Sequence, residues 1–301
     1  MMTDSIRDFD RTTPTACVIV LHCSLGSGRQ WAPLIDRLGD RYQAIAPDIS
    51  GYGDHQRPFD LPANLAEEVR LVSERLPRLS GPIHLVGHSY GGAVAFKMAT
   101  ASPLAGRVRS LTLIEPVLPT LLKHNAADRR LYDGFARLAQ ETCEELWNGL
   151  FMEALDRFTA FWNGSGAPQQ LSPAARLRMI EQVEKVAFDF AAILAEENVA
   201  ASAASLRVPT LLLSGGLSPI LTQRIVARLA SIVVGAETRH LAAAGHRLPF
   251  THAELIHAEI VRHVHRADNL GRLSLVSNRD GAGAKRIGRD MEPAEIASPA
   301  R

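Results

Sequence analysis

Hydrophobic residues recur along this chain in two patterns: short unbroken runs and longer segments with helical spacing. The run 17–22 is almost wholly apolar, and Trp31, Leu34 and Leu38 follow it at helical spacing. This order recurs up to residue 114, with predicted strands at 17–22, 42–46, 82–86 and 108–114 and predicted helices at about 31–38, 64–79 and 93–99. Strands that alternate with helices predict a parallel sheet with helices on both faces.

The alternation stops between residues 118 and 205, where the pattern is helical throughout apart from a Gly-rich break at 163–166. Ser172 followed by Pro173 is typical of a helix start. The strand–helix order then returns, with strands predicted at 208–214 and 236–241 and helices at 219–231 and about 250–266. We therefore expect a helical insertion at the carboxyl edge of the sheet, where open α/β sheets bind ligands.

These patterns predict three parts of the chain. Residues 1–117 and 206–267 form an α/β core, and residues 118–205 form a helical cap. Residues 268–301 are rich in Gly, Arg, Ser, Asp and Ala and have no periodicity, so we predict a disordered tail.

Composition narrows the classes of function. The chain has 301 residues, a formal charge of +1 and no basic cluster, which argues against a nucleic-acid partner. No apolar run reaches about 18 residues, so we expect no membrane span, and the charged start lacks a signal core, which favours a cytoplasmic protein. Three cysteines without CxxC spacing suggest neither a disulfide framework nor a metal site. We expect no cofactor, a small-molecule substrate, and a monomer or homodimer.

The segment Gly87-His88-Ser89-Tyr90-Gly91 carries the clearest chemistry. It joins a predicted strand to a predicted helix and matches the G-x-S-x-G nucleophile elbow. The tight turn exposes the hydroxyl of Ser89 at the N-terminus of a helix, where partial positive charge favours a developing anion. Ser89 is therefore the predicted nucleophile.

A serine hydroxyl needs a base that accepts its proton during attack. The chain has eleven histidines, and His246 follows the last predicted strand in a loop of small residues. His22 and His84 lie in predicted strands, where structural roles are expected, and His88 sits beside the serine on a turn where neighbouring side chains diverge. Four further histidines lie on the last predicted helix and are expected at the surface: His252, His257, His263 and His265. His246 is the predicted base.

Four motifs together resemble the α/β-hydrolase superfamily over roughly residues 15–266. They are His22 with Trp31 nine positions on, the segment 46–53, the elbow 87–92, and 244–246. The resemblance implies an α/β-hydrolase fold and a serine hydrolase with a helical cap. Family members usually have two strands before the His-Gly strand, but only about 16 residues precede it here, so we expect about six strands.

The family's usual acid follows the penultimate strand, but Ser218 occupies that slot here. A hydroxyl cannot supply the negative charge that stabilises an imidazolium. Some superfamily members place the acid one strand earlier, which in this chain is Glu115. One alternative is that Glu115 has a purely structural role. The other carboxylates are weaker candidates, because Glu237 lies too close in sequence to the base and Asp48 is expected to anchor its own loop. We predict that Glu115 is the acid.

The oxyanion hole needs two backbone N–H groups directed at one oxygen. The resemblance implies Tyr90, directly after the nucleophile, and Ser24 in the loop after the first strand, with Leu25 also possible. Cys23 stands where the family usually has glycine, and a side chain there disfavours a positive φ angle.

The first functional hypothesis is an esterase that cleaves a small, mostly apolar ester, lactone or thioester through an acyl-enzyme. A carbon–carbon bond hydrolase of the same fold is the second. A non-catalytic ligand receptor is the third, and Ser218 in the acid slot favours it. Epoxide hydrolases and haloalkane dehalogenases are disfavoured, because both use an aspartate at the position that Ser89 occupies here.

Overall fold

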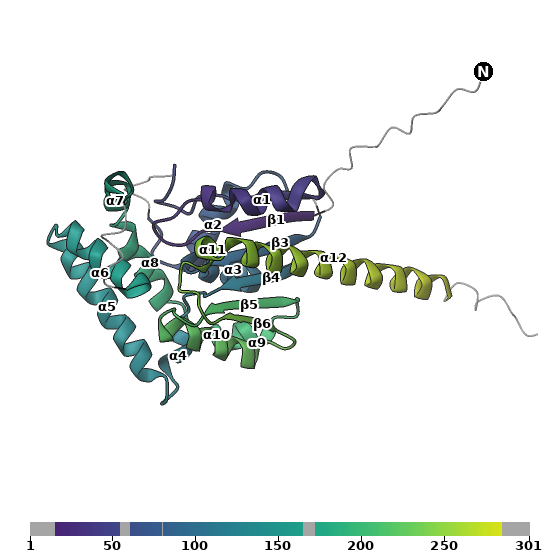
Figure 1. Cartoon of the computed structure of the whole chain (residues 1–301). Helices are drawn as coiled ribbons and strands as arrows, with labels where there is room; N and C mark the ends of the chain where they lie inside the picture. The colour runs from purple at the N-terminus through teal and green to yellow at the C-terminus, as the bar shows by residue number, and fades with distance from the viewer. Residues whose placement is uncertain (1–15, 55–60, 80, 165–171, 285–301) are drawn as a thin grey trace, which may run out of the picture.

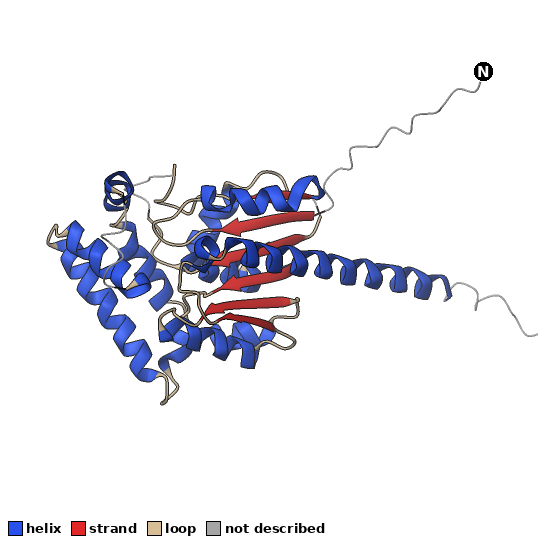
Figure 2. Ribbon diagram, viewed as in Figure 1, coloured by secondary structure: helices blue, strands red, loops and turns tan. Residues whose placement is uncertain are grey.

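The computed structural model describes residues 16–54, 61–79, 81–164 and 172–284. In this part of the chain, six strands form one parallel sheet in the order β2-β1-β3-β4-β5-β6 (Figures 1 and 2). The strands are β1 (Ala16–Leu21), β2 (Tyr42–Ile45), β3 (Ile83–His88), β4 (Val108–Ile114), β5 (Thr210–Gly215) and β6 (Glu237–Leu241). The predicted fold class and strand number are confirmed.

The central strands are apolar on both faces because helices cover both sides of the sheet. Every residue of β1, β3 and β5 is buried, whereas residues of the edge strand β6 alternate between partly buried and exposed. The register pairs Leu21 with Gly87 and His88 with Ile114, so three strands end side by side. The loops after these strands therefore meet at one edge of the sheet.

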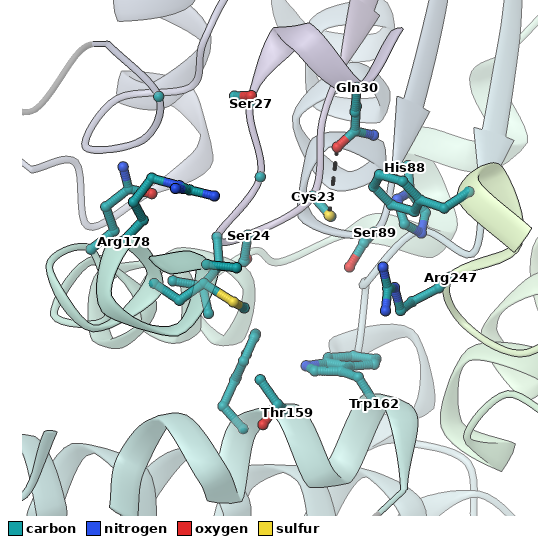
Figure 3. Close-up of a pocket in the computed structure, with 18 of the residues that line it drawn as sticks. Cys23, Ser24, Ser27, Gln30, His88, Ser89, Thr159, Trp162, Arg178 and Arg247 are labelled. Carbon is teal, nitrogen blue, oxygen red and sulfur yellow. Dashed lines mark hydrogen bonds between the residues drawn. The ribbon is translucent and has the colours of Figure 1, made fainter. Parts of the chain in front are cut away.

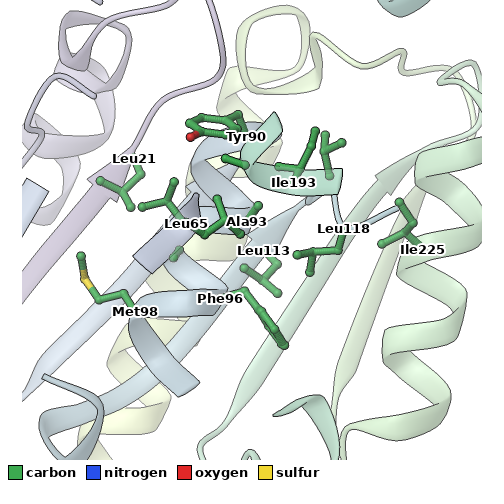
Figure 4. Packing of buried hydrophobic residues seen from close by; sticks show 14 of the residues in the cluster. Leu21, Leu65, Tyr90, Ala93, Phe96, Met98, Leu113, Leu118, Ile193 and Ile225 are labelled. Atoms are coloured by element: carbon green, nitrogen blue, oxygen red, sulfur yellow. The ribbon is translucent and has the colours of Figure 1, made fainter. Parts of the chain in front are cut away.

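Two hydrophobic clusters fill the space between the sheet and its helices. One cluster lies under α2, α3 and α10 and includes Val69, Phe96 and Ile225 (Figure 4). The other lies under α1 and α12 and includes Leu34 and Ile260. The helices of this core are α1 (Ala32–Leu38), α2 (Leu65–Glu74), α3 (Tyr90–Ala101), α10 (Ile220–Ile232), α11 (Leu248–Thr251) and α12 (Ala253–Ala284).

The segment between β4 and β5 is helical, as the sequence predicts, and it extends beyond the carboxyl ends of the strands (Figure 1). Ser172 caps one of its helices, because its hydroxyl accepts the N–H of Ala175. The described helices of this insertion are α4 (Thr120–Lys123), α5 (Arg129–Trp147), α6 (Phe151–Asn163), α7 (Pro173–Ile180), α8 (Lys185–Leu194) and α9 (Val199–Ser205).

The last helix differs from the prediction, because α12 continues to Ala284 instead of ending near 266. Asp268, predicted to begin a disordered tail, is buried and accepts hydrogen bonds from Tyr42 and His84. These contacts hold the helix against the sheet beyond the end of its apolar pattern. Residues 285–301 of the predicted tail and 1–15 of the predicted core lie outside the described residues.

Two histidines of α12 also differ from the prediction. His257 and His263 were expected at the surface, but both are buried. They belong to the face of α12 that packs toward the sheet, and His263 lies within 3.2 Å of the carbonyl of Pro209. None of the described helices is both long and apolar enough to cross a membrane.

Candidate active site

Ser89 lies in the turn between β3 and α3, in a conformation that is unusual for a residue with a side chain. Its φ is 58° and its ψ is −120°, which costs about 1–3 kcal/mol and is typical of functional turns. Glycine is required on both sides because the backbones approach closely. A Cβ on Gly87 would lie 2.3 Å from the carbonyl oxygen of Gly91, and one on Gly91 would lie 2.2 Å from that of His22.

A chain of two hydrogen bonds joins the three residues predicted for catalysis. The Oγ of Ser89 lies 2.9 Å from Nε2 of His246, and Nδ1 of His246 lies 2.6 Å from Oε2 of Glu115. A carboxylate only accepts hydrogen bonds, so Nδ1 carries the imidazole proton and Nε2 is free to accept the serine proton. All three side chains are buried or nearly so.

Glu115 reaches His246 from the end of β4, one strand before the family's usual acid position. Its φ of 44° turns the backbone sharply after the strand, and its Oε1 accepts the N–H of Gly215 at 2.7 Å. Both carboxylate oxygens are therefore fixed in place. Ser218, in the usual acid slot, is buried, and its hydroxyl has no hydrogen-bond partner among the described residues.

Two residues without a predicted site role hold His246 in place. The indole of Trp162 from α6 stacks on the imidazole, with ring centroids 4.3 Å apart and planes 23° from parallel. Nε2 of His88 lies 2.9 Å from the carbonyl oxygen of His246. The sequence shows Trp162 only as one of several aromatic residues in the insertion and gives no sign of this stacking.

His88 is built into the site as a neutral ring. Burial lowers its pKa well below the ordinary value, and the positive charge that His246 can carry lowers it further. A neutral imidazole that donates from Nε2 leaves Nδ1 without a proton, and that atom is buried without a partner among the described residues. His88 therefore positions the loop of His246 and does not compete with it for protons.

The two residues predicted for the oxyanion hole lie at the same edge of the sheet as Ser89, after β1 and β3. Tyr90 begins α3, where backbone N–H groups lack an acceptor within the helix. Ser24 and Leu25 follow β1 and line the same cavity as Ser89. The positive φ in this loop belongs to Leu25, at 57°, and not to Cys23. The side chain at position 23 therefore does not strain the turn.

The loops after β1 and β2 are tied to each other by His22 and Asp48. Nε2 of His22 accepts the N–H of Ile49 at 2.8 Å, and its Nδ1 donates to the carbonyl of Cys23. One oxygen of Asp48 accepts the N–H of Gly28 at 2.7 Å, and the other accepts that of Asp54. His22 has the structural role expected for it, and Asp48 anchors its own loop.

A cavity of about 420 Å³ opens beside Ser89, between the sheet edge and helices α6 and α7 (Figure 3). Its wall mixes apolar and polar side chains, among them Phe158, Trp162, Met179, Gln182, Arg178 and Arg247. Cys23 also lines it, but burial raises the pKa of this thiol to about 12, so it remains protonated. Ser89 and His246 are thus placed at the wall of a space that a small molecule can enter. Within the described part of the chain, no three His, Cys, Asp or Glu side chains gather as a metal site requires.

The curated proteins that resemble this chain in sequence include an esterase and a lipase. The pimeloyl-[acyl-carrier protein] methyl ester esterase of Stenotrophomonas maltophilia (strain R551-3) is 23% identical over 252 residues, which is 81% of this chain and 90% of that protein. Lipase LipV of Mycobacterium tuberculosis is 34% identical, but over 34% of this chain and 38% of the lipase.

Solved structures share the fold at low sequence identity. MenH from S. aureus matches with a TM-score of 0.67 and 17% identity over 85% of this chain and 96% of its own. A hydrolase from Pseudomonas aeruginosa PA01 matches with a TM-score of 0.65 and 20% identity over 83% of this chain and 90% of its own. The sequence model of the alpha/beta hydrolase family matches residues 18–259, so this chain belongs to the alpha/beta hydrolase family.

Proposed function

We propose that this hydrolase cleaves carboxylic esters through an acyl-enzyme, with Ser89 as nucleophile, His246 as base and Glu115 as the acid that orients it. The observation that carries the proposal is the continuous hydrogen-bond chain from the Ser89 hydroxyl through His246 to Glu115. Relatives named as a methyl ester esterase and a lipase support the ester bond as the target.

The reaction begins when a substrate carbonyl reaches Ser89 from the cavity. His246 Nε2 takes the serine proton as Oγ attacks, and Glu115 stabilises the imidazolium that forms. The backbone N–H groups of Tyr90 and Ser24 receive the oxyanion. His246 then gives its proton to the leaving alcohol, and the same residues activate the water that releases the acid.

The size of the cavity and the apolar part of its wall support a small, mostly apolar acyl group, with Arg178 and Arg247 left to face the polar part of the substrate. Phe158 and Trp162 contact each other in this wall, and helices α6 and α7 of the insertion, which would then act as a cap, supply residues that line it. Turnover of p-nitrophenyl esters of increasing chain length, with lactones and thioesters alongside, will define the acyl pocket and the bond that is cleaved.

Labelling with a fluorophosphonate tests the proposal directly, because this probe reacts with an activated serine. We expect stoichiometric labelling at neutral pH, and we expect Ser89→Ala to lose both labelling and ester turnover. Ser110→Ala is a matched control, because Ser110 is also a buried serine beside a histidine. An unlabelled wild-type protein would support the receptor hypothesis instead.

A further inference from the structure

A buried cluster of charge lies next to the proposed oxyanion hole. It consists of Glu68 from α2 with Lys185 and Asp189 from α8, and we name it the Lys185 cluster. The side chains of these residues are at most 3% exposed. The ammonium of Lys185 lies 3.1 Å from Oε2 of Glu68 and also donates to Oδ1 of Asp189. The two helices that supply it belong to different parts of the chain, the sheet-covering core and the insertion.

Both carboxylates of this cluster also bind side chains of the proposed oxyanion-hole residues. The hydroxyl of Tyr90 donates to Oε2 of Glu68 at 3.1 Å. The hydroxyl of Ser24 donates to Oδ2 of Asp189. The Lys185 ammonium also lies 4.8 Å from the centre of the Tyr90 ring. One buried cation therefore links the two loops whose N–H groups must converge.

The cluster stays charged at its centre despite its burial. Burial alone would lower the pKa of Lys185, but Asp189 and Glu68 together raise it above the ordinary value. Burial also raises the pKa of Asp189, and Lys185 with the hydroxyls of Ser24 and Tyr52 counteracts this rise. Buried ion pairs add little net stability compared with apolar packing, but in some proteins they specify a single arrangement of the groups around them. A cluster of this kind is therefore suited to holding backbone groups in register.

We propose that Lys185 and its two carboxylates position the oxyanion hole, so that helix α8 of the insertion sets how well this site stabilises a tetrahedral intermediate. Lys185 is a positioning residue and does not line the cavity. The inference rests on the proposed serine hydrolase activity and adds that its oxyanion donors depend on the insertion. Packing supports the link, because Ile193 of α8 belongs to the same hydrophobic cluster as Tyr90 and Leu21 (Figure 4).

The discriminating variant is Lys185→Met, which keeps an unbranched side chain one atom shorter than lysine and removes its charge. The matched control is Lys97→Met, because Lys97 also joins α3 to the insertion through an ion pair with Glu196 at 2.9 Å but does not bind an oxyanion-hole residue. The readouts are kcat, KM and the ratio of turnover between an oxygen ester and its thiono analogue, in which C=S replaces C=O. Sulfur accepts hydrogen bonds poorly, so this ratio reports on the oxyanion hole and not on overall folding.

We expect Lys185→Met to lower kcat about 10- to 100-fold, somewhat less than the loss of an oxyanion donor. KM should change less than about threefold, and the preference for the oxygen ester should fall about tenfold, since weaker hydrogen bonding to oxygen is the cause. Lys97→Met should keep the wild-type ratio. A folded Lys185→Met enzyme with the wild-type kcat and ratio would overturn the proposal.

Two milder variants keep the test decisive if Lys185→Met does not fold. Ser24→Ala and Tyr90→Phe each remove one hydroxyl bound to the cluster and keep the backbone N–H and the buried charges. Both variants should reduce the preference for the oxygen ester over its thiono analogue. An unchanged preference in both would refute the positioning role. Ester turnover that survives in Ser89→Ala would count against the proposed function itself. If turnover depends on Ser89 but the ratio is unchanged in the cluster variants, the result counts against the positioning proposal alone.

Discussion

Among the residues that the structure describes, two buried histidines each lie between a serine and a carboxylate, at opposite ends of the same two strands. His246 connects Ser89, which follows β3, with Glu115, which follows β4. At the other end, His84 near the start of β3 lies 2.8 Å from the hydroxyl of Ser110 in β4 and 3.1 Å from Asp268.

The two arrangements differ in direction and access. His246 faces its carboxylate with Nδ1 and its serine with Nε2, whereas His84 uses the two nitrogens the other way round. Ser110 lies within a strand directly opposite His84 and is fully buried. Ser89 instead sits on a strained turn and lines the cavity.

The comparison teaches that three residue types within hydrogen-bonding distance do not make a catalytic site. Nucleophilic catalysis also requires a substrate path, N–H groups for the oxyanion and a serine raised above the sheet. In the set around His84, both His84 and Ser110 are fully buried, and the contact with Asp268 ties α12 to the sheet. We therefore expect matched substitutions to affect activity at one end and stability at the other.

The largest expected contrast is between the two carboxylates. Glu115→Gln should lower turnover by about two to four orders of magnitude, because the histidine loses its orientation and the stabilisation of its positive charge. Asp268→Asn should leave kcat/KM within about twofold and lower the free energy of unfolding by about 1–3 kcal/mol, because His84 and Tyr42 lose a charged acceptor. Ester assays and urea unfolding measure the two effects.

A second substitution sharpens the result for Glu115. Adding Ser218→Asp to Glu115→Gln should restore part of the lost turnover, because the carboxylate then occupies the family's usual acid slot. Near-normal activity in Glu115→Gln alone would mean that Glu115 is structural and that another group orients His246.

Acid should destabilise the protein through His84. Burial lowers its pKa from 6.5 to about 4, although Asp268 opposes the shift. As the pH drops from about 6.5 to about 4, His84 takes up a proton in the unfolded chain but not in the folded chain, so the free energy of unfolding falls through this range. The shift corresponds to about 3 kcal/mol between pH 6.5 and pH 4. Urea unfolding at several pH values gives the free energy of unfolding as a function of pH. This free energy should fall less steeply with acid in His84→Gln than in the wild type, and an equal dependence on pH would contradict this assignment.

The smallest expected effect concerns the stacking on His246. Trp162→Ala should lower kcat about two- to tenfold, the range that aromatic pairs contribute, and Trp162→Phe should retain most of the activity. Trp147 is a matched control because it lies in the same insertion but is 91% exposed. If Trp147→Ala and Trp162→Ala reduced kcat equally, the loss could not come from the stacked ring.

Local sequence patterns were sufficient for the fold, and they predicted the two residues, Ser89 and His246, that lie within hydrogen-bonding distance in the structure. Apolar runs and helical spacing predicted a parallel sheet, because strands that are buried on both faces are apolar at consecutive positions. The resemblance and the short segment before the first strand predicted about six strands. The glycines around Ser89 were informative because backbone clashes at Gly87 and Gly91 exclude other residues. The place of Glu115 followed from the resemblance and from the strand before it, and the structure puts its carboxylate beside His246.

Contacts between distant segments could be seen only in three dimensions. No sequence pattern connects Ser24 with Asp189, Trp162 with His246, or Tyr42 with Asp268, and the apolar pattern places the end of α12 too early. Periodicity records which residues face inward, because burial acts on each residue within its own element. It does not record which inward-facing polar groups meet, because the packing of whole helices against the sheet decides that.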